Sequence, residues 1–277
     1  MKKTRIQCLC FTVGFMVGIV FQTVGIPAYG ADENQVEHVD LRSFFGTDQA
    51  TFVFHDLDRM TMTVFNSARA KLAFSPCSTF KIPNSLIGIE TGVIQDASHP
   101  YQWDGVRRAI PTWNRDQTMR TAFQNSVVWY YQRLAGQVGE ERMREYLQKI
   151  EYGNQDISSG LTAFWLSASL RISAIEQVVF LEKLVRDRLP FSERTVGIVK
   201  EIMVLEQDGT TVFRGKTGSG TLPDGKPLGW FVGYVEKGGH CYLFAANQDT
   251  VPGTNGMMVR DTVKQILTAW DLMPEKR

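Results

Sequence analysis

The chain has 277 residues, of which 30 are basic, 29 are acidic and 43% are hydrophobic. This length allows one large domain or two interleaved domains with a sizeable core. The near-neutral charge and the lack of basic runs argue against a nucleic-acid partner. His38, His55, His99 and His240 are scattered and form no metal-ligand motif, so we expect no metal site.

The first thirty residues have the pattern of a signal peptide. A basic start, MKKTR, precedes an apolar run over residues 8–26, and Ala28-Tyr29-Gly30 supplies small residues at a cleavage site. The competing interpretation is an uncleaved membrane anchor. We expect cleavage near Gly30/Ala31, a periplasmic or secreted mature chain and no stable membrane association. Loss of three positive charges leaves 27 basic against 29 acidic residues.

The remaining chain changes its hydrophobic period twice. Alternation over residues 50–65 predicts a hairpin, and residues 70–74 should form a short extended entry into the next helix. From Leu205 onward the alternation returns, with a reversal at Gly238-Gly239. Between them the period is helical, and Ser173 to Glu176 is a capping box. The expected helices span 119–123, 127–134, a segment marked by Met143 to Ile150, 173–187, one from Ser192, and 257–272; the later strands span 211–217, 229–236 and 240–247.

This order of elements predicts an α/β (α+β) fold. Residues 31–76 and 196–277 should form a domain with an antiparallel sheet flanked by helices, and residues 77–195 an inserted helical domain.

The stretch from Phe74 to Pro83 contains a serine and a lysine three residues apart. If the helix begins at Ser78 as its N-cap, Ser78 and Lys81 lie on one face of it. The positive end of the helix dipole would then favour an oxyanion beside the serine hydroxyl. The S-x-x-K pattern is weak by itself, because a chain of this length can contain it by chance.

Three further motifs remove this ambiguity. Ser126-Val127-Val128, Tyr152-Gly153-Asn154 and Lys216-Thr217-Gly218 follow in that order. The combination resembles the penicillin-recognising serine acyltransferases, which carry S-x-x-K, a second serine motif and K-T-G. Because the second motif is Ser-Val-Val and Phe164-Trp165-Leu166 is present, the chain is similar to class D (oxacillinase-type) serine β-lactamases from about Phe74 through the last helix. That family has the serine β-lactamase and penicillin-binding-protein fold, and the resemblance therefore implies an active site in the cleft between the sheet-bearing domain and the helical domain.

The resemblance implies hydrolysis of β-lactam antibiotics through an acyl-enzyme on Ser78. A free lysine with a pKa near 10.4 would be protonated at neutral pH, but burial lowers this value. The resemblance implies that Lys81 is carboxylated by CO2 or bicarbonate and acts as the general base for acylation and deacylation, without another cofactor. Val128, Trp165 and Leu166 would form the apolar pocket around the carbamate, with the indole N–H of Trp165 holding one oxygen.

The same resemblance assigns the remaining site residues. Ser126 would pass a proton to the departing lactam nitrogen, and Lys216 would bias that transfer electrostatically. The catalytic set would thus be Ser78, Lys81, Ser126 and Lys216, and the substrate-binding set Ser126, Thr217, Gly218, Ser219 and Arg260.

Two of these assignments concern groups that stabilise charge on the substrate. The backbone N–H groups of Ser78 and Ser219 would form an oxyanion hole. Thr217 and Arg260 would bind the substrate carboxylate, because a guanidinium matches a planar carboxylate. The alternative for Arg260 is a solvated helix residue without a role.

Two rival functions share this chemistry: a β-lactam sensor domain that keeps its acyl adduct, and a D-Ala-D-Ala peptidase or transpeptidase. The apparent signal peptide without further membrane spans favours a β-lactamase over a membrane receptor. Cys77 and Cys241 should be buried, unpaired thiols. The sequence predicts small-molecule β-lactam substrates, but neither their range nor the oligomeric state.

Overall fold

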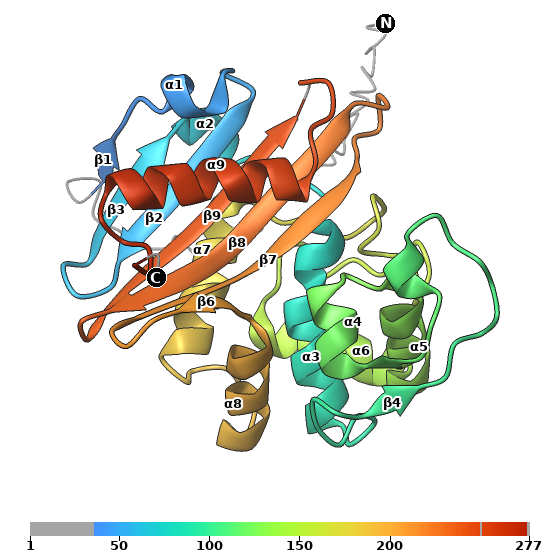
Figure 1. The fold of residues 1–277 in the computed structure, drawn as a ribbon. Helices are drawn as coiled ribbons and strands as arrows, with labels where there is room; N and C mark the ends of the chain where they lie inside the picture. Colours follow the sequence, from blue (N-terminus) through green and yellow to red (C-terminus); the bar gives the residue numbers. More distant parts are fainter. Residues whose placement is uncertain (1–35, 250, 276–277) are drawn as a thin grey trace, which may run out of the picture. The chain divides into compact units, whose positions relative to one another are not determined.

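A seven-stranded mixed sheet forms the centre of the protein in the computed structural model, which describes residues 36–249 and 251–275 (Figure 1). The predicted signal peptide lies outside the described residues. The strands follow the order β1-β3-β2-β9-β8-β7-β6. Their bounds are β1 Val36–His38, β2 Ala50–Asp56, β3 Thr61–Phe65, β6 Val204–Gln207, β7 Thr211–Thr221, β8 Pro227–Lys237 and β9 His240–Asp249.

The alternating stretches form the strands predicted from the sequence. β2 and β3 make the first hairpin, and β8 and β9 are joined by Gly238 and Gly239, which both adopt positive φ angles (59° and 87°) that suit glycine. The sheet predicted as antiparallel is mixed, because at one edge β1 pairs with β3 in parallel. That strand has only three residues and lies outside the stretch whose alternation identified the hairpin.

Helices cover both faces of the sheet. α9 (Gly256–Ala269) lies across one face, where its apolar side joins a core with Phe52, Phe231 and Phe244 (Figure 1). α7 (Ala174–Val185) packs against β2 and β9 from the other side. Its predicted capping box is confirmed: Ser173 Oγ accepts from the backbone N–H of Glu176, whose carboxylate accepts from the N–H of Ser173.

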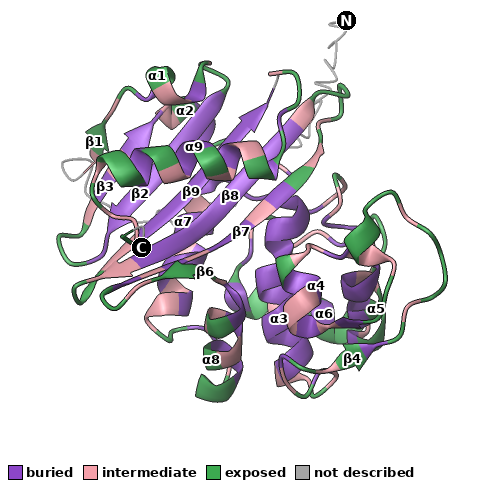
Figure 2. Cartoon of the chain, in the orientation of Figure 1, coloured by how far each residue is buried: buried purple, intermediate pink, exposed green. Residues whose placement is uncertain are grey.

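The other helices lie mainly beside the sheet. α3 contacts α5 and α8, and a short 3₁₀ turn, η2, precedes α3 and packs against β7. Figure 2 shows α3 buried along nearly its whole length, whereas much of α9 facing the viewer is exposed. The remaining bounds are α1 Arg42–Phe45, α2 Ser67–Ala70, η2 Cys77–Phe80, α3 Lys81–Glu90, β4 Pro100–Tyr101, η3 Pro111–Trp113, β5 Gln117–Thr118, α4 Met119–Gln124, α5 Val128–Val138, α6 Glu140–Ile150 and α8 Glu193–Ile202.

Two local predictions near the serine are wrong. Ser78 is not an N-cap: it lies inside η2, and α3 begins at Lys81 without a capping side chain. The expected extended segment over 70–74 is preceded by the helical turn α2, and only Phe74 makes a β-bridge, with Ile172. The buried Phe80 follows Thr79, and the tight turn brings both side chains inward.

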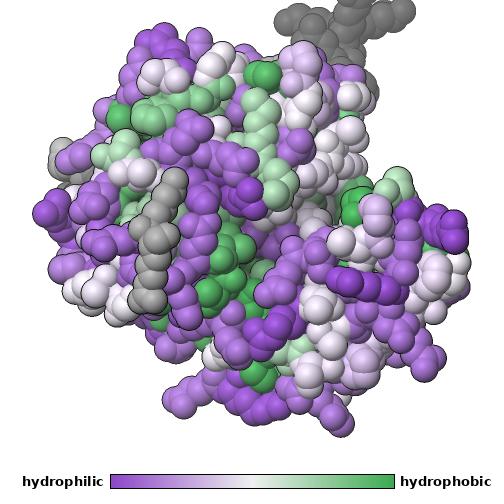
Figure 3. Space-filling view, viewed as in Figure 1, coloured by the Kyte–Doolittle hydropathy of each residue, from purple (hydrophilic) through white to green (hydrophobic). Residues whose placement is uncertain are grey.

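The face of the molecule seen in Figure 3 is mainly hydrophilic, and its hydrophobic residues gather in small patches. Within residues 36–249 and 251–275, no helix combines the length and apolar character needed to cross a bilayer.

Candidate active site

The serine and lysine of the S-x-x-K motif meet in the interior of the protein. Cys77 begins η2 with a φ of 50°, and Ser78 and Lys81 lie on opposite sides of the junction between η2 and α3. The Nζ atom of Lys81 donates to Ser78 Oγ at 2.8 Å. Ser78 is 9% exposed and Lys81 is fully buried. The predicted pair therefore exists, although a 3₁₀ turn rather than an N-capped helix produces it.

The surroundings of Lys81 favour a neutral amine. Burial lowers the pKa of Lys81 well below its usual value, and the nearby charge of Lys216 lowers it further. The Nζ atom of Lys81 lies over the ring of Tyr131, 5.3 Å from the ring centroid. Tyr131 was not predicted as a site residue. It lies one helical turn beyond Val128 on α5, and this spacing after the second serine motif is the signal that could have identified it.

The second serine and second lysine also meet. Ser126 has a φ of 56° and lies between α4 and α5. Lys216, on β7, donates from Nζ to Ser126 Oγ at 3.2 Å and to the carbonyl oxygen of Thr217 at 3.1 Å. Burial lowers the pKa of Lys216 to about 7. Two buried lysines, each bonded to a serine hydroxyl, thus belong to one electrostatically coupled site.

Glycines allow three chain segments to approach one another beside these lysines. A Cβ atom on Gly218 would lie 2.9 Å from the carbonyl oxygen of Pro76, and one on Gly256 would lie 2.6 Å from the carbonyl oxygen of Gly218. Both distances are too short for ordinary side chains. The backbone of β7 at Gly218 is therefore packed between the turn that carries Ser78 and the start of α9.

Trp165 supplies an unused hydrogen-bond donor in the interior. Its side chain is fully buried and stacks on Phe80, the neighbour of Lys81, with ring centroids 5.5 Å apart. Its Nε1 atom has no hydrogen-bond partner among the described residues. Val128 and Leu166, the other predicted pocket residues, are only half-buried.

The Tyr152-Gly153-Asn154 motif braces this region. Asn154 donates from Nδ2 to the carbonyl oxygen of Ser169 and accepts from the N–H of Arg171, so it holds the segment after Trp165. Tyr152 packs edge-on against Phe80.

A buried polar chain extends this bracing to the serine turn. The hydroxyl of Tyr152 donates to Gln177, whose amide donates to Thr79 Oγ1 at 3.0 Å. Thr79 Oγ1 in turn donates to the carbonyl oxygen of Pro76 at 2.8 Å.

The last two predicted residues lie near the start of α9. The side chain of Ser219 is exposed, and its Oγ accepts from the N–H of Gly256 at 2.9 Å. Arg260 is on the first turns of α9 and donates to its neighbour Asp261 at 2.7 Å. Since Gly256 touches Gly218, this end of α9 borders the site.

The cysteines are free thiols in the described part of the chain. Cys77 is buried, whereas Cys241 is only half-buried, which corrects the prediction of two buried thiols. Burial raises the pKa of both thiols, that of Cys241 to about 12, so neither is an activated nucleophile. In the part that the structure describes, no three His, Cys, Asp or Glu side chains gather in a way that could hold a metal ion.

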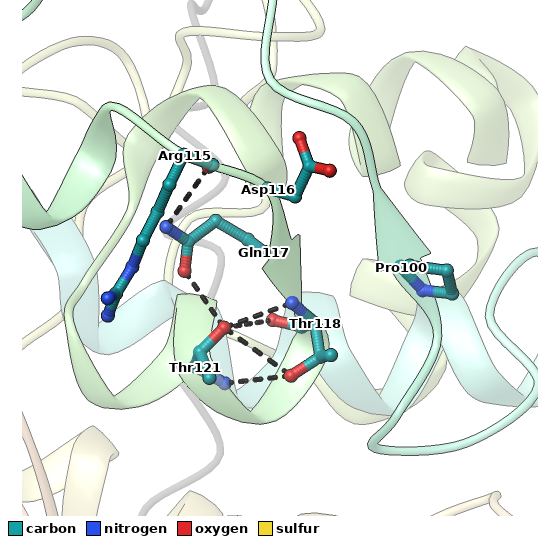
Figure 4. A pocket seen from close by; sticks show the side chains of 6 residues that line it. All are labelled: Pro100, Arg115, Asp116, Gln117, Thr118 and Thr121. Atoms are coloured by element: carbon teal, nitrogen blue, oxygen red, sulfur yellow. Dashed lines mark hydrogen bonds between the residues drawn. The ribbon is translucent and has the colours of Figure 1, made fainter.

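A surface depression of about 400 Å³ lies elsewhere, beside β4 and β5 (Figure 4). Its polar groups bond to one another: Thr121 donates to Gln117, which donates to the carbonyl oxygen of Arg115. None of the residues around Ser78 lines it. The lining residues are Pro100, Arg115, Asp116, Gln117, Thr118 and Thr121.

Comparison with known proteins assigns this chain to a family. Residues 41–268 match the model of the penicillin binding protein transpeptidase domain. The β-lactamase OXA-48 of Klebsiella pneumoniae is 39% identical over 259 residues, which cover 93% of this chain and 97% of that protein. The class D β-lactamase BAT-2 superposes with a TM-score of 0.81 at 38% identity, covering 86% of this chain and 98% of that one.

The chain therefore belongs to the penicillin-binding protein transpeptidase family, and within it to the class D β-lactamases. It is an enzyme of the serine-hydrolase type, as the resemblance predicted. The C-terminal domain of the Bacillus licheniformis BlaR penicillin-receptor shares the fold, with a TM-score of 0.81 and 33% identity over 86% of this chain and 98% of that one. The same fold therefore occurs in a penicillin receptor as well as in the class D β-lactamases.

Proposed function

We propose that this enzyme hydrolyses β-lactam antibiotics through an acyl-enzyme on Ser78, with a carboxylated Lys81 as the general base in both half-reactions. The observation that carries the proposal is the 2.8 Å contact between Lys81 Nζ and Ser78 Oγ. The lysine that makes this contact has a pKa that burial lowers well below its usual value. The reacting atoms would lie in a cleft between the sheet-bearing part, 31–76 and 196–277, and the helical part, 77–195.

The residues present fit a carbamate on Lys81. A neutral amine adds CO2 with loss of a proton, and burial lowers the pKa of Lys81 well below its usual value, which favours the neutral form. The resulting anion needs hydrogen-bond donors in the interior, and Trp165 offers an N–H that no described residue uses. Such a carbamate supplies an oxygen base of the kind that serine acylation and ester hydrolysis require.

The bond changes can be written for this chain's own residues. Ser78 Oγ gives its proton to the base at Lys81 and attacks the lactam carbonyl carbon. The ring C–N bond breaks, and this proton reaches the departing nitrogen through the hydroxyl of Ser126. Water then cleaves the Ser78 ester and restores the serine. Lys216, 3.2 Å from Ser126 Oγ and with a pKa of about 7, is suited to favour that proton delivery.

Substrate would be held by groups at the end of β7 and the start of α9. Thr217, Gly218 and Arg260 would bind the substrate and its carboxylate, and the N–H groups of Ser78 and Ser219 would hold the oxyanion. Exposed Ser219 supports this role, because its side chain is already bonded to Gly256 and fixes the local backbone.

The test is a pre-steady-state assay of the mature protein with a chromogenic penicillin, in CO2-depleted buffer and after addition of bicarbonate. We expect turnover that falls on depletion and returns with bicarbonate. A stoichiometric burst followed by a stable acyl-enzyme would instead identify a β-lactam sensor. Turnover of D-Ala-D-Ala peptides with slow penicillin release would identify a peptidase.

The variant Lys81→Ala separates binding from chemistry. We expect it to bind penicillin but to lose at least about 10⁴ in kcat, since it removes the base. Lys149→Ala, on the exposed surface of α6, is the matched control and should keep wild-type turnover. Near-wild-type kcat in Lys81→Ala would remove Lys81 from the mechanism.

A further inference from the structure

We propose that Ser75 is a positioning residue, which fixes Trp165 so that its indole N–H is held ready for the carbamate on Lys81. This inference rests on the carbamate proposed above. Ser75 lies three residues before the nucleophile and is 1% exposed. It belongs to none of the motifs that identified the site.

The side chain of Ser75 ties the serine turn to the Trp165 segment with two bonds. Its Oγ donates to the carbonyl oxygen of Trp165 at 2.9 Å and accepts from the N–H of Ser167 at 2.9 Å. One hydroxyl thus holds the backbone on both sides of Leu166. Since η2 starts only two residues after Ser75, the same contact sets the distance between that segment and Lys81.

The backbone of Ser75 is itself anchored to the sheet. Its carbonyl oxygen accepts from Nε1 of Trp230, on β8, at 3.0 Å. On the other side, Ser167 Oγ accepts from the N–H of Thr221, the last residue of β7, at 3.0 Å. The Trp165 segment is therefore linked to two adjacent strands, once through Ser75 and once through Ser167.

These hydrogen bonds position the indole of Trp165, in addition to stabilising the fold. The indole of Trp165 stacks on Phe80 with ring centroids 5.5 Å apart and meets Phe164 edge-to-face at 4.9 Å, so these two rings define its plane. Stacking permits sliding of a ring within its plane, whereas a hydrogen-bond donor must be placed within a few tenths of an ångström. The bonds from Ser75 fix the backbone at Trp165 and so fix where along that plane the N–H lies.

The experiment compares Ser75→Ala with wild type in CO2-depleted buffer titrated with [13C]bicarbonate. Two quantities are measured: the bicarbonate concentration that restores half of the activity, and the 13C NMR signal of the lysine carbamate. Losing one hydrogen-bonded support should raise the half-restoring concentration about tenfold. The carbamate signal should fall in parallel at a fixed concentration, while kcat at saturating bicarbonate stays near the wild-type value.

Ser169→Ala is the matched control. Ser169 lies in the same segment, and its Oγ also donates to a carbonyl oxygen, that of Asp156, at 2.9 Å and accepts from the N–H of Ser159. It makes no bond to Trp165, so its bicarbonate requirement should be unchanged. If Ser75→Ala folds poorly, Ser75→Cys, which keeps a weaker donor, should show a smaller shift in the same direction.

The outcomes distinguish this inference from the proposed function. A wild-type enzyme without a carbamate signal and without bicarbonate dependence overturns the carboxylated lysine itself. A wild-type carbamate signal combined with an unchanged half-restoring concentration in Ser75→Ala overturns only the role of Ser75. Equal shifts in Ser75→Ala and Ser169→Ala would show a general loosening of the segment and would also overturn it.

Discussion

The cost in folding stability of burying the charge of Lys216 can be measured directly. Burial lowers the pKa of Lys216 from the ordinary 10.5 to about 7. Between these values the unfolded chain binds a proton that the folded chain does not, so stability rises with pH from about 7 to 10.5. Below pH 7 both states are protonated and the penalty for burying the charge is fully present. Each pH unit corresponds to about 1.4 kcal/mol, so the whole penalty is roughly 5 kcal/mol.

The perturbation is Lys216→Met, which keeps an unbranched apolar side chain and removes the amine. The free energy of unfolding of the variant minus that of wild type should be largest at pH 6. Between pH 7 and pH 9 this advantage should shrink by about 2 to 3 kcal/mol, as wild type loses its penalty. The lost bonds to Ser126 and Thr217 shift the difference equally at every pH and do not affect this slope.

The assay is urea unfolding at pH 6, 7, 8 and 9 in CO2-depleted buffer, which keeps Lys81 unmodified in both proteins. Lys71→Met is the control, because Lys71 is exposed and its ammonium is solvated in both states. A difference between Lys216→Met and wild type that does not change between pH 7 and 9 would show that Lys216 is not desolvated as described. Activity measured on the same samples should be strongly reduced at every pH.

Two further substitutions test the bracing motif and the carboxylate site. Gly153→Ala should destabilise the protein by about 3 kcal/mol or more in urea unfolding, because its Cβ would lie 2.0 Å from the carbonyl oxygen of Arg171 at a φ of 53°. Gly105→Ala, also at positive φ but with open space around it, should lose only about 1 kcal/mol, and equal losses would contradict the steric argument. Arg260→Ala should raise KM for a penicillin at least about tenfold with a smaller change in kcat, whereas Asp261→Ala should leave KM unchanged or lower it; an unaltered KM in Arg260→Ala would make it a surface residue.

Much of the fold was predictable because the hydrophobic period changes cleanly along the chain. The hairpin, the α7 capping box and the strands around Lys216 depend on local patterns and were found correctly. The parallel pairing of β1 was missed because a three-residue edge strand carries too little pattern. The expected cap at Ser78 was wrong because a serine before an apolar run favours an N-cap, whereas here the backbone N–H of Thr79 donates to the carbonyl oxygen of Pro76, three residues earlier, in a 3₁₀ turn.

Some residues of the site are predictable from the spacing of motifs in the sequence, whereas others can be found only from the packing in the structure. Three motifs, S-x-x-K, Ser-Val-Val and K-T-G, predicted Ser78, Lys81, Ser126 and Lys216, and the structure brings each serine to its lysine. The residues that were missed act through long-range contacts without any fixed spacing.

Tyr131 reaches Lys81 from α5, and Ser75 reaches a backbone carbonyl 90 residues away. A buried lysine loses its charge because its neighbours exclude water, and the carbamate proposed for Lys81 would need a hydrogen-bond donor beside it. The reactivity of Lys81 is thus a property of the packing around it. The S-x-x-K motif predicts the position of the Lys81 amine. The packing of the surrounding segments, which hydrogen bonds of Ser75 and Asn154 hold together, determines the reactivity of that amine.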